Sequence, residues 1–226
     1  MRNFDWLSQM SDQERTELER GAVIRRYARG EMVFAPTPRP HSVYLLQGGL
    51  VRIYRLSEGG GETSFGYVAP GEVFGELPAF GDYPRESFAQ AVRPSQVWKI
   101  PCENFQRVLA ARSALALQVT RQIGDRLKRI ETRVEDLVFR NVRTRIARML
   151  GELAEDFGQV ENGYRVIDIP ITQSELATLV GATRQTVNQT LRELSDEGLI
   201  GRDNRRIVVL QPELLSQLVS AAPEPA

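Results

Sequence analysis

Residues 172–194 read TQSELATLVGATRQTVNQTLREL, and this stretch carries the start and end signals of two short helices. Thr172 and Glu175 form a T-x-x-E capping box, in which each side chain accepts a hydrogen bond from the backbone N–H group of the other residue. Gly181 lies where a tight turn between helices requires a positive φ angle. Thr183 is placed to cap a second helix. The stretch therefore predicts a helix-turn-helix.

The second helix separates apolar from polar side chains. Val187, Leu191 and Leu194 follow a helical spacing and are expected to face inward. The other face carries long side chains that form hydrogen bonds, namely Arg184, Gln185, Asn188, Gln189 and Arg192. Arginine binds guanine through two hydrogen bonds, and glutamine and asparagine bind adenine in the same way.

We therefore expect the second helix to enter the major groove of double-stranded DNA, with Thr172 and Thr183 as further DNA-binding residues. One alternative is a helical pair whose polar face is only solvated. Another is a protein-interaction module whose helix-turn-helix binds protein instead of DNA.

The segment after this motif, LIGRDNRRIVVL (199–210), predicts two short strands that turn at Asp203 and Asn204. Such a hairpin beside a helix-turn-helix is a wing. Arg205 and Arg206 lie at its tip, and we expect Arg205 to contact a DNA phosphate. The alternative is that these arginines are solvent-exposed surface residues that do not contact DNA.

Composition limits the possible functions. Lys plus Arg and Asp plus Glu number 29 each, so DNA binding must depend on a local surface and not on the net charge. His41 is the only histidine, which argues against metal sites built from several imidazoles and against a cupin-type enzyme, the alternative for a β-barrel chain. We expect no catalytic residue, no metal and no cofactor; haem held by His41 or Cys102 stays open as an alternative.

The chain also shows features of a cytoplasmic protein. Cys102 is the only cysteine, so no internal disulfide can form, which fits a reducing compartment. The N-terminus lacks the apolar segment of a signal peptide. No apolar run approaches the ~20 residues of a membrane helix.

Residues 21–100 alternate short β-type runs with glycine- and proline-rich turns. The runs include VYLLQ (43–47), LVRIYRL (50–56) and SQVWKI (95–100). Several short strands at this spacing predict an antiparallel barrel or sandwich. A helical lead-in precedes them, with four apolar anchors, Phe4, Leu7, Met10 and Leu18.

Residues 102–157 have a helical pattern with a break at 139–141, and Asn141 is expected to cap the helix that follows the break. Before the break, apolar residues repeat at alternating spacings of four and three: Ile123, Leu127, Ile130, Val134 and Leu137. This heptad pattern predicts a helix that pairs with its copy in a parallel dimer. The alternative is a helix that packs on its own barrel.

Across nearly its whole length the chain resembles the CRP/FNR family of transcription regulators. The matching stretches are YLLQGGLVRIY (44–54), PGEVFGEL (70–77), SFAQAV (87–92), FRNVRTRIARML (139–150) and residues 172–200. The resemblance implies an α+β fold, with an N-terminal antiparallel β-roll like that of cyclic-nucleotide-binding domains, a long dimerisation helix and a C-terminal winged helix-turn-helix. The expected boundaries are 1–110 for the roll with its lead-in, 111–139 for the helix and hinge, 140–220 for the DNA-binding domain and 221–226 for a disordered tail.

The resemblance also implies a homodimer on a palindromic DNA site, with RNA polymerase as a further partner. Thr183 and Arg184 match the family's Ser/Thr-Arg pair at the start of the recognition helix. Gln185 and Gln189 replace a glutamate and an arginine that are frequent there. Because an amide and a carboxylate prefer different base edges, the expected DNA site differs from that of the cAMP receptor.

In cAMP-binding members of the family, a Gly-Glu-Leu turn holds the ribose and an Arg-Ser pair holds the phosphate. Gly75, Glu76 and Leu77 match the turn, and Ser87 matches the serine. The alternative for this turn is a purely structural role, as the entry into a short helix.

The arginine of that pair is displaced in this chain. Glu86 falls on its position and Arg85 lies one residue earlier, where a strand is expected to turn its side chain to the opposite face. A bulge at Pro84 that returns Arg85 to the site is the alternative. Ile130 and Glu131 stand where the family's cAMP receptor has the Thr-Ser pair that meets adenine. We therefore expect a sensor that does not respond to cAMP and whose effector is unknown; activation by cAMP or another nucleotide is the alternative.

Overall fold

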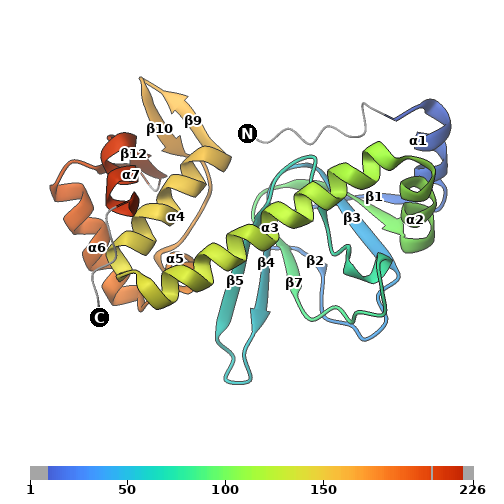
Figure 1. Ribbon diagram of the computed structural model, residues 1–226, viewed down its shortest axis with the longest axis horizontal. Coiled ribbons are helices and arrows are strands. Elements are labelled where there is room, and N and C mark those ends of the chain that lie inside the picture. Colours follow the sequence, from blue (N-terminus) through green and yellow to red (C-terminus); the bar gives the residue numbers. More distant parts are fainter. Residues whose placement is uncertain (1–9, 205, 221–226) are drawn as a thin grey trace. The chain divides into compact units, whose positions relative to one another are not determined.

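The computed structural model describes residues 10–204 and 206–220 and divides the chain into two compact units, one ending at Leu127 and the other beginning at Lys128. Helix α3 (Ser113–Phe139) contributes to both (Figure 1). The predicted anchors Phe4 and Leu7, the predicted phosphate contact Arg205 and the predicted tail 221–226 lie outside the described residues.

The N-terminal unit is a β-roll of two four-stranded sheets in which every pairing is antiparallel. This confirms the predicted fold class for the first half of the chain. One sheet has the order β1 (Val23–Tyr27), β8 (Ser95–Pro101), β3 (Ser42–Gly48) and β6 (Val73–Phe74). The other has the order β2 (Met32–Phe34), β7 (Phe88–Ala91), β4 (Val51–Leu56) and β5 (Glu62–Val68).

Two apolar clusters stabilise the roll. The first includes Leu18 of α1 (Asp12–Glu19), Trp98 of β8 and Phe105 of α2 (Cys102–Ala111), and Met10 packs against it. The second lies between the sheets and contains a trio of aromatic rings whose centroids are 5.0–5.9 Å apart, Phe34, Tyr44 and Phe74. The apolar anchors predicted at Met10 and Leu18 are therefore confirmed.

The C-terminal unit is a set of helices over a small sheet, and none of its described helices is long and apolar enough to cross a membrane; the same holds for the described helices of the N-terminal unit. The sheet is antiparallel with the strand order β11-β12-β10-β9. In chain order the elements are α4 (Val142–Phe157), β9 (Gly158–Glu161), β10 (Tyr164–Ile167), α5 (Gln173–Val180), α6 (Arg184–Asp196), β11 (Ile200–Asp203), β12 (Arg206–Val209) and α7 (Pro212–Ser220).

The helix-turn-helix has the caps that the sequence predicts. The Thr172 hydroxyl accepts a hydrogen bond from the Glu175 N–H (3.1 Å), and the Glu175 carboxylate accepts one from the Thr172 N–H (2.7 Å). Gly181 ends α5 in the left-handed conformation, with φ +63°. The Thr183 hydroxyl accepts a hydrogen bond from the Thr186 N–H (3.1 Å) and starts α6. β11 and β12 form the predicted wing, which turns through Asn204 at a positive φ of 55°.

Gly49, directly after β3, offers a test of packing in the roll. Its φ is +94°, and an added Cβ would lie 2.6 Å from Ser95 Cα and against the Pro94 carbonyl oxygen. Gly49→Ala is therefore expected to lower the free energy of unfolding by about 3 kcal/mol or more, because left-handed strain and steric overlap add. The measurement is chemical denaturation.

Gly30→Ala is the matched control, since Gly30 has a similar φ of +87° and no atom within 4 Å of its added Cβ. It is expected to cost only about 1 kcal/mol of left-handed strain. Equal costs for the two variants would show that the Gly49 contact relaxes freely.

Candidate functional site

Helix α6 buries one face and exposes the other. Val187, Leu191 and Leu194 are almost fully buried. The exposed face carries four of the predicted base-reading residues, Arg184, Gln185, Gln189 and Arg192. Asn188 is half-buried at the edge of this face. The helix is therefore anchored through its apolar side and presents hydrogen-bonding groups outward.

The arginines of α6 differ from Arg143 and Arg206 of the same unit. Arg143 donates to Glu197 (2.8 Å), and Arg206 donates to Glu161 (2.7 Å) and to Asp203. Within the described part of the chain, neither Arg184 nor Arg192 forms a hydrogen bond or an ion pair. Their guanidinium groups are exposed and remain available to an outside acceptor.

Two amide side chains of α6 already use part of their hydrogen-bonding capacity. Gln173, the first residue of α5, donates to the Asn188 side-chain oxygen (3.2 Å). Gln189 donates to Glu193 one turn along the helix (3.1 Å). Each amide keeps further capacity to donate and accept, and each contact restricts how that amide can turn.

A hollow of about 640 Å³ lies between the start of α5, the start of α6 and the wing. Three cationic side chains line it: Arg184, Arg202 and Arg206. Hydrogen bonds to Glu161 and Asp203 raise the pKa of Arg206 and occupy its guanidinium. Arg202 is exposed on β11, and the sequence reasoning missed it, although its place beside the wing turn was a signal.

The predicted orientation of Arg85 and Glu86 in the sensor unit is wrong. Arg85 is only 7% exposed and lies inside the roll, where it donates to the carbonyl oxygens of Ser42 (2.7 Å) and Gly75 (2.9 Å). Glu86 lies on the surface and pairs with Arg55.

The reason is how the backbone of Arg85 is paired. Arg85 pairs with Thr37 in an isolated bridge, and β7 begins only at Phe88. The residues between them are not in a regular strand, so strict alternation of faces does not apply across Pro84–Ser87. Arg85 does turn to the interior, as the alternative expected, but through an irregular segment and not through a bulge in a strand.

The interior around Arg85 is aromatic and contains no acidic partner for it among the described residues. The guanidinium carbon lies 4.2 Å from the ring centre of Phe34 and 5.0 Å from that of Tyr44. Gly75 has φ +63°, and an added Cβ would come within 3.1 Å of the Arg85 Nη2 atom. Gly75 and Arg85 are thus brought together.

Glu76, next to Gly75, is engaged by α3. Arg126 donates to the Glu76 carboxylate (3.2 Å) and to the Val73 carbonyl oxygen (2.6 Å). Gln122 also bonds both backbone groups of Val73, as acceptor at 3.0 Å and as donor at 2.5 Å. The Gly-Glu-Leu turn is therefore fastened to the first half of α3.

The remaining predicted effector residues do not contact Gly75, Glu76 or Arg85 through a hydrogen bond or ion pair among the described residues. Leu77 is about half exposed and begins a short 3-10 helix, and Ser87 is half-buried just before β7. Ile130 and Glu131 belong to the C-terminal unit, where Ile130 is exposed and Glu131 pairs with Lys128 (3.6 Å).

The predicted dimer residues of α3 form an exposed apolar row after Ile123. The exposed fractions are 55% for Leu127, 45% for Ile130, 56% for Val134 and 51% for Leu137. Ile123 is half-buried and packs against the core of its own roll. The alternative of a helix packed on its own barrel therefore holds for the first part of α3, and Ile123 is not in the exposed row.

The two residues considered as haem ligands, His41 and Cys102, lie in the roll. His41 is exposed in the loop before β3, and Cys102 begins α2. Burial raises the pKa of the Cys102 thiol, which disfavours the reactive thiolate. The described residues hold no cluster of three or more His, Cys, Asp or Glu side chains that could bind a metal ion.

Comparison with known proteins gives matches for both units. The profile of the Cyclic nucleotide-binding domain matches residues 24–112, and that of the Crp-like helix-turn-helix domain matches residues 144–218. The chain is 31% identical over 191 residues to the CRP-like cAMP-activated global transcriptional regulator of Mycobacterium tuberculosis, covering 84% of this chain and 85% of that protein.

Two further proteins have the same architecture. The Global nitrogen regulator of Synechococcus elongatus is 31% identical over 199 residues, covering 87% of this chain and 90% of that one. A solved CRP/FNR-family transcriptional regulator from Thermus thermophilus superposes with a TM-score of 0.73 at 27% identity, covering 88% of this chain and 100% of that one. The order of the two domains and the similarity over most of the length lead to one conclusion: the chain belongs to the CRP/FNR family of transcription regulators.

Proposed function

We propose that the chain regulates transcription as a homodimer that binds a palindromic DNA site. The observation that carries this proposal is the outer face of α6, where Arg184 and Arg192 are exposed and have no partner within the described residues. An exposed arginine without an internal acceptor is suited to bind a base edge or a phosphate.

Within this proposal the residues of the DNA-binding face have different roles. Arg184, Gln185 and Gln189 read base edges in the major groove, with Asn188 and Arg192 at the border of the contact. Thr172 and Thr183 approach the phosphates at the starts of their helices, where the helix dipole favours an anion. Arg202 and Arg205 bind phosphates from the wing, while Arg206 stabilises the wing itself through Glu161.

The dimer is supported by the exposed row on α3. Four large apolar side chains at heptad spacing, each close to half exposed, are costly to leave in water. Pairing with the same row of a second copy buries them in a parallel coiled coil. We also propose that the protein works with RNA polymerase at chromosomal DNA and is therefore cytoplasmic. It acts by binding and catalyses no reaction.

For the sensor we propose that it does not respond to cAMP, so that DNA binding does not require this nucleotide. The support is that Glu76 is already paired with Arg126, and that Arg85 already donates to two carbonyl oxygens. The second candidate is activation by cAMP or another nucleotide. It is favoured by the buried positive charge of Arg85, which has no acidic partner in the described interior, and by the cAMP-activated relative.

The DNA-reading role predicts a base-specific loss for Arg184→Ala. The variant is expected to lose about 1–3 kcal/mol of binding free energy at one base pair of each half-site, and to stop discriminating at that position. Fluorescence anisotropy with a selected site and with single-base variants measures both effects.

Arg202→Ala provides the comparison, since a lost phosphate contact weakens all sequences alike and reduces the salt dependence of binding. Arg107→Ala, on α2 of the roll, is the control for charge loss away from the DNA-binding face. If Arg184→Ala weakened binding to all sequences alike, its role as a base reader would be wrong. A wild-type protein that binds no DNA would instead favour the protein-interaction alternative.

The dimer predicts a loss of self-association for Val134→Glu. A carboxylate at the centre of the apolar row places two like charges opposite each other in the pair, so sedimentation is expected to show monomer. Lys128→Glu, at an exposed position off the row, is expected to leave the dimer intact. A dimer that survives Val134→Glu contradicts the role of this row.

The sensor proposal predicts no saturable binding of a fluorescent cAMP analogue to the wild-type protein, measured by anisotropy. It also predicts the same DNA affinity with and without cAMP. The nucleotide-activated alternative requires two other results. The wild-type protein would bind the analogue saturably, with binding lost in both Arg85→Ala and Glu76→Ala, and cAMP would raise the DNA affinity of the wild-type protein.

A further inference from the structure

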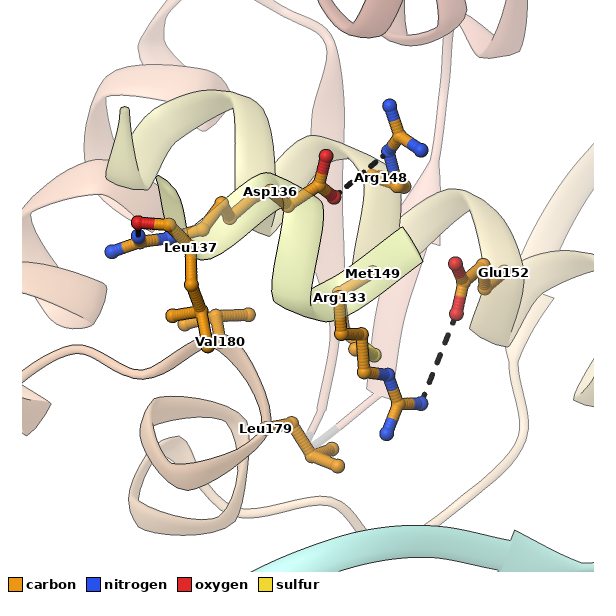
Figure 2. A pocket seen from close by; sticks show the side chains of 9 residues that line it. Arg133, Asp136, Leu137, Arg148, Met149, Glu152, Leu179 and Val180 are labelled. Atoms are coloured by element: carbon orange, nitrogen blue, oxygen red, sulfur yellow. Dashed lines mark hydrogen bonds and ion pairs between the residues drawn. The ribbon is translucent and has the colours of Figure 1, made fainter. Parts of the chain in front are cut away.

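Three ion pairs join the second half of α3 to α4, and we call them the charge ladder. Arg129 pairs with Asp156 (2.8 Å), Arg133 with Glu152 (3.8 Å) and Asp136 with Arg148 (3.0 Å). Figure 2 shows the last two pairs from close by. From one pair to the next the residue number rises on α3 and falls on α4, as expected for two helices that run in opposite directions.

The ladder is shielded from water. Each of its six side chains is less than one-third exposed, and Asp136 is nearly buried. Burial raises the pKa of Glu152 and Asp136 and lowers that of Arg133, so these charges are costly to bury. Removing one member of such a pair leaves its partner charged in a poorly hydrated place, which destabilises the arrangement more than loss of a surface pair does.

The order of the charges selects one register. α3 offers two cations and then an anion, while α4 offers the opposite charges in the matching order. If α4 shifted along α3 by about one helical turn in one direction, Arg148 would lie opposite Arg133. A shift in the other direction would place Glu152 opposite Asp136. Either shift leaves one pair of like charges and only one pair of opposite charges, so the observed pairing, with three opposite pairs, is the favoured one.

The end of α3 is also tied to the turn of the helix-turn-helix. Arg145 donates to the carbonyl oxygens of Leu137 and Gly181, each at 3.4 Å. A Cβ on Gly181 would lie 2.5 Å from the Leu137 Cδ2 atom, so the glycine makes room for this side chain. Leu137, Leu179 and Val180 line a small cavity beside the ladder (Figure 2).

We propose that the charge ladder holds the helix-turn-helix at a fixed angle to α3 and thereby sets the spacing between the two DNA half-sites. The inference rests on the proposed homodimer, in which α3 lies along the dimer axis. The exposed apolar row is about 110° around the helix from the ladder. One continuous helix therefore carries both the apolar row that forms the dimer and the ladder that sets the orientation of α6.

Glu152→Gln is the main test, because the amide keeps the shape of the side chain and removes its charge. The full-length protein is titrated with DNA duplexes in which the two half-sites are moved apart or together by one and two base pairs, and with a duplex that holds a single half-site. Wild-type protein is expected to lose roughly tenfold in affinity for a one-base-pair change, similar to a single mismatched base pair.

In Glu152→Gln the loss on changing the spacing is expected to shrink to roughly threefold or less, with the single half-site bound as by wild type. The charge swap Arg133→Glu with Glu152→Arg is expected to restore the spacing preference, since it rebuilds the pair. Lys128→Ala, which removes an exposed pair with Glu131 on the same helix, is the matched control and is expected to keep the preference.

The outcomes separate the two proposals. A wild-type protein without any spacing preference contradicts the palindromic homodimer itself. A wild-type preference that Glu152→Gln retains overturns the role of the ladder. If Glu152→Gln fails to fold, as judged by its far-ultraviolet circular dichroism, the charge swap decides: a folded swap variant that has lost the preference also overturns it.

Discussion

The helical period of α3 is the constraint on which the other parts of the molecule depend. In its first half, one side packs against the core of the roll through Ile123, and Gln122 and Arg126 fasten the β6 segment and Glu76. In its second half, one side forms the charge ladder with α4 and another exposes an apolar row. A single residue inserted in the middle of α3 would turn every later side chain by about 100° about the helix axis relative to Gln122 and Arg126.

The features that the sequence predicted correctly are mostly local ones. The capping box of Thr172, the left-handed Gly181 and the cap at Thr183 depend on residues at most four positions apart, and all three are present. The antiparallel strands of the roll were predictable for a similar reason, because period-two alternation and turn residues are local signals. The domain order then followed from the family resemblance, which the matches over most of the chain confirm.

The features that the sequence did not predict depend on distant partners. Arg85 turns inward because an isolated bridge with Thr37, 48 positions earlier in the chain, sets its backbone, and strand alternation cannot show such a bridge. The heptad pattern includes Ile123, yet the nearby roll covers this side chain. The charge ladder joins residues 12 to 27 positions apart on two helices, and their pairing is defined only once α4 folds back along α3.

The central proposal is that this regulator binds DNA as a dimer through α6, without an added effector. Selection of bound duplexes from a random pool by the purified full-length protein, with and without cAMP, tests this most directly. We predict enrichment of the same palindrome in both selections, since the recognition face and the apolar row are present in the protein alone. Enrichment of no sequence in either selection would contradict the DNA-binding claim, and a palindrome found only with cAMP would contradict the independence from effector.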